Sequence, residues 1–166
     1  MISRWLFVLA LLLGGCGGDP GSGPIEVKWD RDACERCRMV LSSPQHAAQV
    51  RYRDEGGKSR VKLFDDIGCA VIWLEGQPWK AQPGIEIWVA DHRDGRWLDA
   101  RQAFYVTAGS TPMEYGLSAQ GTAAEGALAF PQAKAHIFAT EAQARIHGAH
   151  LLQRLEEQAA QRRSSP

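Results

Sequence analysis

The stretch Cys34-Glu35-Arg36-Cys37-Arg38-Met39 organises the chain, because it places three sulfur-bearing side chains within six residues. Thiolates and thioethers are soft, polarisable ligands that favour Cu(I) over hard cations. Two arginines flank the thiols, and positive charge beside a cysteine lowers its pKa and so favours the metal-binding thiolate. The stretch therefore predicts a soft-metal site. A disulfide or a structural zinc site remains an alternative, because redox, zinc and copper sites all use the C-x-x-C spacing.

Residues 1–15 have the features of a signal peptide. Arg4 supplies a positive n-region, and the apolar run that follows is too short to span a bilayer as a helix, which takes ~20 residues. The sequence then reads Leu13-Gly14-Gly15-Cys16, which resembles a bacterial lipobox. That resemblance implies cleavage just before Cys16 and diacylation of Cys16, and two acyl chains anchor a protein stably to a membrane. An ordinary secretory signal that contains a cysteine is the alternative.

Cys16 and the Gly- and Pro-rich residues after it, 16–24, are predicted to form a lipidated, flexible linker. We expect a lipid-anchored periplasmic protein, and Gly17 gives no inner-membrane retention signal, which favours the outer membrane. A folded domain is predicted over residues 25–160, with a frayed polar tail at 161–166.

Charge and cysteine content narrow the possible functions. The chain balances 19 basic against 19 acidic residues. It therefore lacks the basic field that nucleic-acid binding requires. Lipidation of Cys16 leaves Cys34, Cys37 and Cys69 in the exported domain. Because an odd number of thiols cannot pair completely, at least one is expected to be free or metal-bound.

Hydrophobic periodicity predicts strands and helices in alternation. Apolar and polar residues alternate over 48–53 and again over 60–63, with Asp54-Glu55-Gly56-Gly57 as the hairpin loop between them. Asp66 is a favourable N-cap for an apolar helix from Ile67 to about Leu74. Further strands are expected at 85–90, 97–98 and 104–106. The spacing of Thr140 and Gln143 suits a capping box, so the last helix is predicted to start at Thr140.

Cys69 lies within the first predicted helix, among apolar residues. Since a buried free cysteine behaves as a small hydrophobic residue, Cys69 is expected in the core rather than at a metal. Among the five histidines, His147 and His150 have a helical spacing, which is typical of an exposed helix face. A histidine that completes the metal shell remains an open alternative.

These motifs together resemble the NosL family of nitrous-oxide-reductase accessory lipoproteins. The resemblance rests on the lipobox, on C-x-x-C-x-M at 34–39, on Phe64-Asp65-Asp66-Ile67-Gly68-Cys69 and on Thr111-Pro112-Met113-Glu114-Tyr115-Gly116. It implies an α+β fold of two small ββα-type units, similar to the organomercurial lyase fold. It also implies a Cu(I) metallochaperone that delivers copper for the copper–sulfide centre of nitrous oxide reductase.

The family's site residues carry over to particular positions of this sequence. The resemblance makes Cys34, Met39 and Met113 copper ligands. Cys37 is expected as a further ligand from the C-x-x-C spacing, although family members vary at its position. The implied partner is apo nitrous oxide reductase or another periplasmic copper client.

A weak internal repeat supports two similar units. Met39 precedes Phe64 by the same interval that separates Met113 from Phe138. If this repeat is real, a pseudo-twofold axis relates the units and brings Met113 towards the stretch 34–39.

Two other classes of function compete with a copper carrier. A thiol–disulfide oxidoreductase, or a lyase like the fold relative, is disfavoured because no nucleophile, base and orienting group stand together in the sequence. A structural zinc or disulfide lipoprotein is the other class. Structural zinc usually takes four Cys or His ligands, and the three thiols lie in two distant places in the sequence, Cys34 with Cys37 and then Cys69. We therefore expect a binding protein rather than an enzyme.

Overall fold

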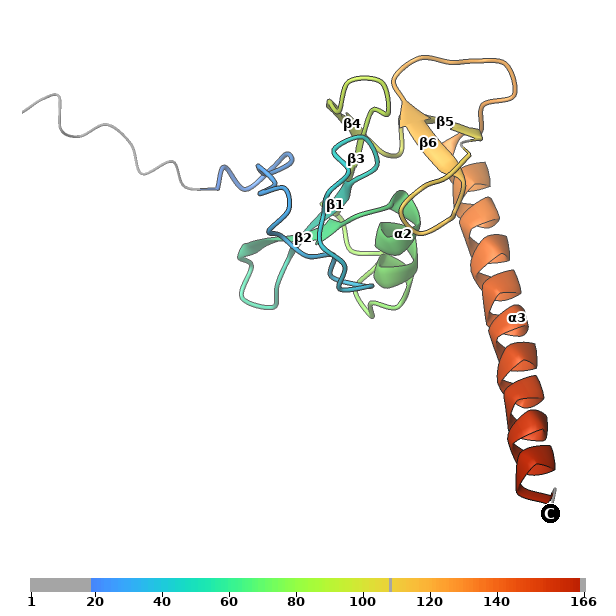
Figure 1. Cartoon of the computed structure of the whole chain (residues 1–166). Helices are drawn as coiled ribbons and strands as arrows, with labels where there is room; N and C mark the ends of the chain where they lie inside the picture. The colour runs from blue at the N-terminus through green and yellow to red at the C-terminus, as the bar shows by residue number, and fades with distance from the viewer. Residues whose placement is uncertain (1–18, 108, 165–166) are drawn as a thin grey trace, which may run out of the picture.

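The computed structural model describes residues 19–107 and 109–164, with side chains up to residue 158. The predicted signal peptide (1–15) and Cys16 lie outside these residues. The fold is α+β (Figure 1). One antiparallel sheet has four strands in the order β2-β1-β3-β4, and a second sheet pairs β5 with β6. The strands are β1 (Ala48–Arg53), β2 (Ser59–Phe64), β3 (Glu86–Ala90), β4 (Trp97–Asp99), β5 (Phe104–Thr107) and β6 (Leu117–Gln120).

The predicted hairpin and first helix are confirmed. β1 pairs with β2 from Ala48 opposite Phe64 to Arg53 opposite Ser59. The helix α2 (Ile67–Glu75) follows at once, and the side chain of its N-cap, Asp66, accepts a hydrogen bond from the Gly68 amide at 2.9 Å. Local signals, the period-two alternation and the capping residue, are sufficient to define this unit.

The strand β1 differs from the prediction of a half-buried strand, because both of its faces are buried. Gln49 and Arg51, expected to face solvent, are 0 % and 2 % exposed. The Gln49 amide exchanges two hydrogen bonds with the backbone of Ile25. Arg51 donates to the Gly23 carbonyl and makes a two-pronged ion pair with Asp19, at 2.7 Å for each contact.

The segment before the domain is therefore not a free linker throughout. Residues 16–24 were predicted to be flexible, but the described part, 19–24, is held against β1. Its composition is that of a linker, yet a buried arginine at a central strand needs an anionic partner, and Asp19 supplies it.

The second ββα unit consists of β5, β6 and the helix α3 (Phe130–Ser164). β6 was not among the strands expected from the sequence. The helix α3 begins ten residues before the predicted start at Thr140, which lies inside it. The reason is tertiary packing: Ala133 and Ile137, one helical turn apart, are fully buried. Pro131 is compatible with a first helical turn, where its missing N–H has no intrahelical acceptor.

The repeat that was inferred from two equal Met-to-Phe intervals is wrong in its alignment. Phe64 ends a strand and precedes a helix cap, whereas Phe138 lies within α3. The two ββα units are present, but the residues that the repeat equated have different secondary structures.

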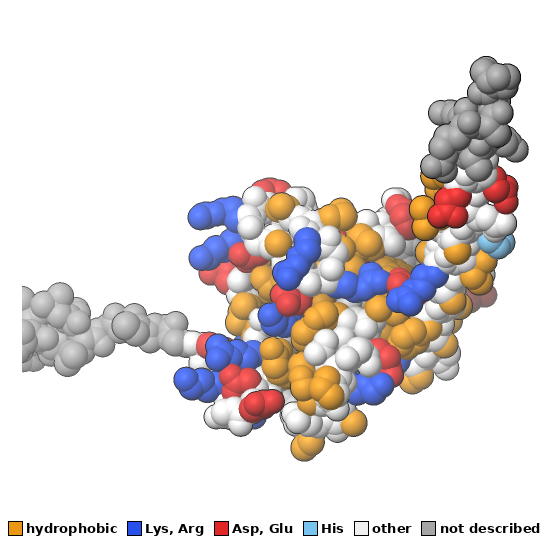
Figure 2. All heavy atoms as spheres, turned by 90° about the horizontal axis from the view of Figure 1, so that it is seen from below, with side chains coloured by type: hydrophobic (Ala, Val, Ile, Leu, Met, Phe, Trp, Pro, Cys, Tyr) orange, Lys and Arg blue, Asp and Glu red, His pale blue; other side chains and the backbone are white. Residues whose placement is uncertain are grey.

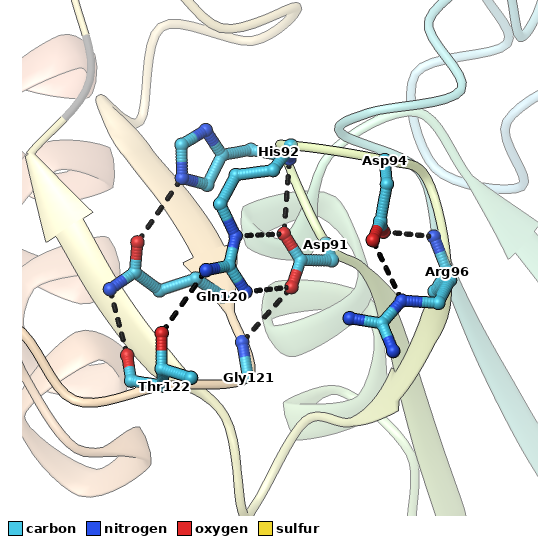
Figure 3. Close-up of polar contacts among 8 residues, drawn as sticks. Asp91, His92, Asp94, Arg96, Gln120, Gly121 and Thr122 are labelled. Carbon is cyan, nitrogen blue, oxygen red and sulfur yellow. Dashed lines mark hydrogen bonds and ion pairs between the residues drawn. The ribbon is translucent and has the colours of Figure 1, made fainter.

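Asp91, immediately after β3, joins the two sheets (Figure 3). Its fully buried carboxylate binds the Arg93 guanidinium at 2.6 and 2.9 Å and accepts the Gly121 amide at 3.1 Å. The neighbouring His92 amide donates to the Ala119 carbonyl of β6 at 2.9 Å. This junction fixes the second sheet, and with it the loop that leads into β6, relative to the first.

The helix α3 continues past the body of the domain (Figure 1). From Ala142 to Gln158 its described side chains are exposed, and hydrophobic ones reach the surface beside charged ones (Figure 2). It remains helical to Ser164, into the part predicted to be a frayed tail. None of the helices that the structure describes combines the length and apolar character needed to span a bilayer.

Candidate metal centre

The stretch 34–39 folds into a tight loop. The Cys34 amide donates to the Met39 carbonyl at 2.8 Å, and the Arg38 amide donates to the Cys34 carbonyl at 3.0 Å. Arg38 adopts a left-handed conformation, with φ 67°, which turns the chain back on itself. The Glu35 amide donates to the Leu63 carbonyl at 2.8 Å and so fixes the loop to the end of β2.

The end of β2 and the start of α2 bring two more residues to this loop. Asp65 follows β2, and its Oδ2 accepts a hydrogen bond from the Cys37 thiol at 3.2 Å. Cys69 lies in the first turn of α2. The hairpin register and the Asp66 cap thus determine where these two side chains lie.

Cys34, Cys37, Asp65 and Cys69 form one cluster, in which one ligand atom of each lies within 4.8 Å of the others. Cys34 and Cys69 are 0 % exposed, Asp65 is buried, and Cys37 is partly exposed. All three cysteines are free thiols, so the expected alternative of a Cys34–Cys37 disulfide is not formed. Four donor atoms at this separation are suited to hold one metal ion.

The donor set fits a bound metal ion on two grounds. Three soft sulfur atoms favour Cu(I) or zinc over magnesium or calcium. In addition, Asp65 Oδ1 is buried without a hydrogen-bond partner among the described residues. Since a buried polar oxygen is costly to leave unsatisfied, an ion or a proton at this position stabilises the cluster.

The three thiols differ in acidity. A hydrogen bond from the Cys69 thiol, with further help from backbone groups of Cys37 and Asp65, lowers the pKa of Cys34 to about 6. The same hydrogen bond, together with burial, raises the pKa of Cys69. Burial raises the pKa of Cys37 to about 12. Cys34 is therefore the thiol that ionises first and offers the first anionic ligand.

Arg36, inside the C-x-x-C motif, links the cluster to α3. Its guanidinium binds the Glu141 carboxylate at 2.7 Å and donates to the Tyr115 hydroxyl at 3.0 Å. The Tyr115 hydroxyl in turn donates to Glu141 at 2.7 Å. Arg36 also approaches the sulfur of Cys69, at 3.8 Å. The Arg36 side chain thus connects the loop 34–39, here called the sulfur loop, with α2, α3 and the turn before β6.

The predicted ligands have different positions relative to the cluster. The structure brings Cys34 and Cys37 together. Met39 is 49 % exposed at the end of the loop. Met113 is partly buried, packs against the core, and its amide donates to Asp66 at 3.3 Å. The roles of Met39 and Met113 as ligands stay predictions.

Two members of the cluster were not expected at the site. Cys69 was predicted to be a core residue; it is buried, but its sulfur faces the other thiols. The secondary-structure pattern indicates a role for Asp66, as the helix cap, but none for its neighbour Asp65. The sequence does contain a signal for Asp65, because an acidic residue stands just before the cap and four residues from Cys69. The cluster of cysteine and acidic side chains contains no histidine, and His147 and His150 lie on the exposed part of α3.

Comparison with known proteins identifies the family. A family model described as NosL matches residues 24–149. No curated protein and no solved structure matches the chain. Because the family model covers more than half of the chain, the chain belongs to the NosL family.

Proposed function

We propose that this chain is a periplasmic, membrane-anchored Cu(I) metallochaperone that supplies copper for assembly of the copper–sulfide centre of nitrous oxide reductase. The observation that carries the proposal is the cluster of three thiols at Cys34, Cys37 and Cys69, in a chain of the NosL family. Copper is cargo in this proposal, and the chain is a carrier rather than an enzyme.

Cys34 is the first ligand, because its pKa of about 6 makes it anionic at neutral pH. Cys37 follows in the same loop and lies closer to solvent. The thioethers of Met39 and Met113 are the neutral donors in this proposal. A Cu(I) site needs few ligands, so two thiols with methionine sulfur are sufficient.

Release of the metal requires that a ligand from the client reach the site. Met39 is half exposed, and Cys37 is partly exposed beside it in sequence. An incoming sulfur or nitrogen ligand on this side replaces a weak thioether first. The strong thiolate of Cys34 then dissociates last, so copper is never free.

The alternative of a thiol–disulfide oxidoreductase is disfavoured by burial. Such an enzyme attacks its substrate through an accessible low-pKa thiol. Cys34 has the low pKa but is 0 % exposed. The thiol that is partly exposed, Cys37, has a pKa that burial raises to about 12, so no thiol of the cluster is both accessible and acidic.

Zinc binding is a second candidate, and the four-donor cluster favours it. Structural zinc is four-coordinate and accepts cysteine and aspartate ligands. In the sequence Cys69 is distant from the Cys34 and Cys37 pair, but the fold brings all three thiols together with Asp65. The relative affinity for the two metals distinguishes the candidates, because a copper carrier prefers Cu(I) and a zinc-stabilised domain prefers zinc.

The test of the metal is anaerobic titration of the purified chain with Cu(I) and with Zn(II), in competition with chelators of known affinity. We expect one tightly bound Cu(I) per chain and strong preference for it over zinc. Cys34→Ser is expected to abolish tight copper binding, whereas Cys16→Ser, the matched control outside the cluster, leaves it unchanged. Equal loss in both variants, or a preference for zinc, contradicts the proposal.

The membrane anchor is tested with the same control variant. The lipobox motivates acylation of Cys16, and Asp19, three residues on, is held at β1. The folded domain is therefore expected to lie close to the membrane. Wild-type protein should fractionate with membranes, and Cys16→Ser should be soluble or remain an uncleaved precursor. An intact mass that shows a free, unmodified Cys16 at the mature N-terminus contradicts this part.

A further inference from the structure

Arg36 is held on three sides. Nη2 binds Glu141 at 2.7 Å, and Nη1 lies 3.0 Å from the Tyr115 hydroxyl and 3.8 Å from the Cys69 sulfur. The side chain is 23 % exposed. An arginine in this position is a fixed positive charge beside the metal cluster rather than a solvated surface residue.

Cys69 needs such a charge if its sulfur is to bind a metal. A metal-bound cysteine sulfur is anionic, and Cys69 is fully buried with Cys34 and the Asp65 carboxylate nearby. Several negative groups in one buried cluster are costly unless a cation compensates them. Arg36 supplies that cation, and the first turn of α2, where Cys69 lies, adds the positive end of a helix dipole.

The second arginine of the loop has no such role. Arg38 points to solvent, with 73 % of its side chain exposed, and its salt bridge is a 3.6 Å contact to Glu35. The two arginines are one residue apart on either side of Cys37. Arg36 and Arg38 carry the same charge in different surroundings, so a substitution of Arg38 is a matched control for the same substitution of Arg36.

We propose that Cys69 is a third thiolate ligand of the metal and that Arg36 is the positioning residue that makes its sulfur available. The inference rests on the proposed function in taking the cluster as the metal site, and it adds a ligand that sequence reasoning assigned to the core. Glu141 and Tyr115 hold Arg36 in place, so residues of α3 and of the turn before β6 support a ligand on α2.

The experiment counts thiolate ligands with Cd(II) alone as the probe, on the full chain under anaerobic conditions. Each cadmium–thiolate bond contributes to an ultraviolet charge-transfer band, while carboxylate and thioether ligands do not contribute comparably. We expect a band that corresponds to three thiolates in wild-type protein and to two in Cys69→Ala. Arg36→Gln is expected to lose one thiolate and to bind the metal roughly 10–100-fold more weakly, the usual range for loss of an outer-shell partner.

Three controls distinguish positioning from general damage. Arg38→Gln should keep three thiolates and wild-type affinity. Arg36→Lys, which keeps the charge, should restore most of the third thiolate, even if Arg36→Gln folds poorly. Glu141→Gln removes an anchor of Arg36 but keeps the cation, so it should lower thermal stability and retain three thiolates.

Two thiolates in wild-type protein, or three in Cys69→Ala, overturn the proposal. So does an Arg36→Gln protein that matches Arg38→Gln in both band intensity and affinity. Failure of the proposed function has a different signature. In that case wild-type protein gives three cadmium thiolates but does not prefer Cu(I) in the competition titration, and the ligand assignment stands.

Discussion

The Asp65 carboxylate accepts a hydrogen bond from the Cys37 thiol through Oδ2 at 3.2 Å, while its Oδ1 is buried without a hydrogen-bond partner among the described residues. One oxygen thus orients a sulfur and the other is available to an ion. Carboxylate oxygen is a good zinc ligand and a poor Cu(I) ligand. Asp65 is therefore the residue whose contribution to affinity is expected to differ most between the two candidate metals.

Asp65→Asn is expected to weaken Zn(II) binding by at least about tenfold, which is ~1.4 kcal/mol. Asparagine keeps the shape and removes the charge, so Cu(I) affinity should change little. Chelator competition with both metals on the same preparation measures the two effects. An equal loss of Cu(I) and Zn(II) affinity would show that the carboxylate supports both ions.

Gly68→Ala is expected to destabilise the domain. A Cβ at Gly68 would lie 2.1 Å from Cδ2 of Tyr115, and Tyr115 is fixed by Arg36 and Glu141. Overpacking of this kind costs ~1–3 kcal/mol. Equilibrium denaturation measures the loss.

The control for this substitution is Gly148→Ala, also in a helix, where a Cβ meets nothing within 4 Å. It should leave stability unchanged or raise it by up to ~1 kcal/mol, because alanine favours helix over glycine. A neutral Gly68→Ala would show that Tyr115 moves aside easily.

The parts of the fold that the sequence predicts well are those with local causes. The hairpin of β1 and β2 follows from alternation, and α2 follows from the Asp66 cap. The start of α3 was misplaced because the signal at Thr140 is local, whereas the helix is extended towards its N-terminus by burial of Ala133 and Ile137. Tertiary packing outweighed a favourable capping pair.

The residues of the site show the same division between local signals and tertiary packing. Cys34 and Cys37 were identified because their spacing is a local motif. Cys69 and Asp65 join them through the pairing of β1 with β2 and the position of α2, which a single sequence does not display. The role of Asp19 was missed for a similar reason. The segment around it has the composition of a linker, and its partner Arg51 is 32 positions away.

Asp19→Asn is expected to remove a pH-dependent part of the stability. The hydrogen bonds from Arg51 lower the pKa of Asp19 from 3.8 to about 2. A lowered pKa stabilises the folded state above the unfolded value, near pH 4, and this contribution is lost as the pH falls through about 2. Wild-type protein should therefore have a higher melting temperature than Asp19→Asn at pH 7, and the two should converge at the acid end. Glu26→Gln, an exposed carboxylate on the same segment, is the control, and a constant difference at all pH values would contradict the prediction.

Met113→Leu tests the thioether that the proposed function assigns to copper. The Met113 amide is held by Asp66, the residue next to Asp65 of the cluster, and its side chain is partly buried against the core. Leucine preserves the apolar volume, so the cost in stability should stay below ~1.5 kcal/mol. A thioether is a neutral, weaker donor than a thiolate, so Cu(I) should still bind at one per chain, but more weakly. Zn(II), for which the second candidate needs only the thiolates and Asp65, should be unaffected. If Met113→Leu leaves the Cu(I) affinity unchanged while Met39→Leu lowers it, the exposed methionine of the sulfur loop is the copper ligand and Met113 only packs against the core.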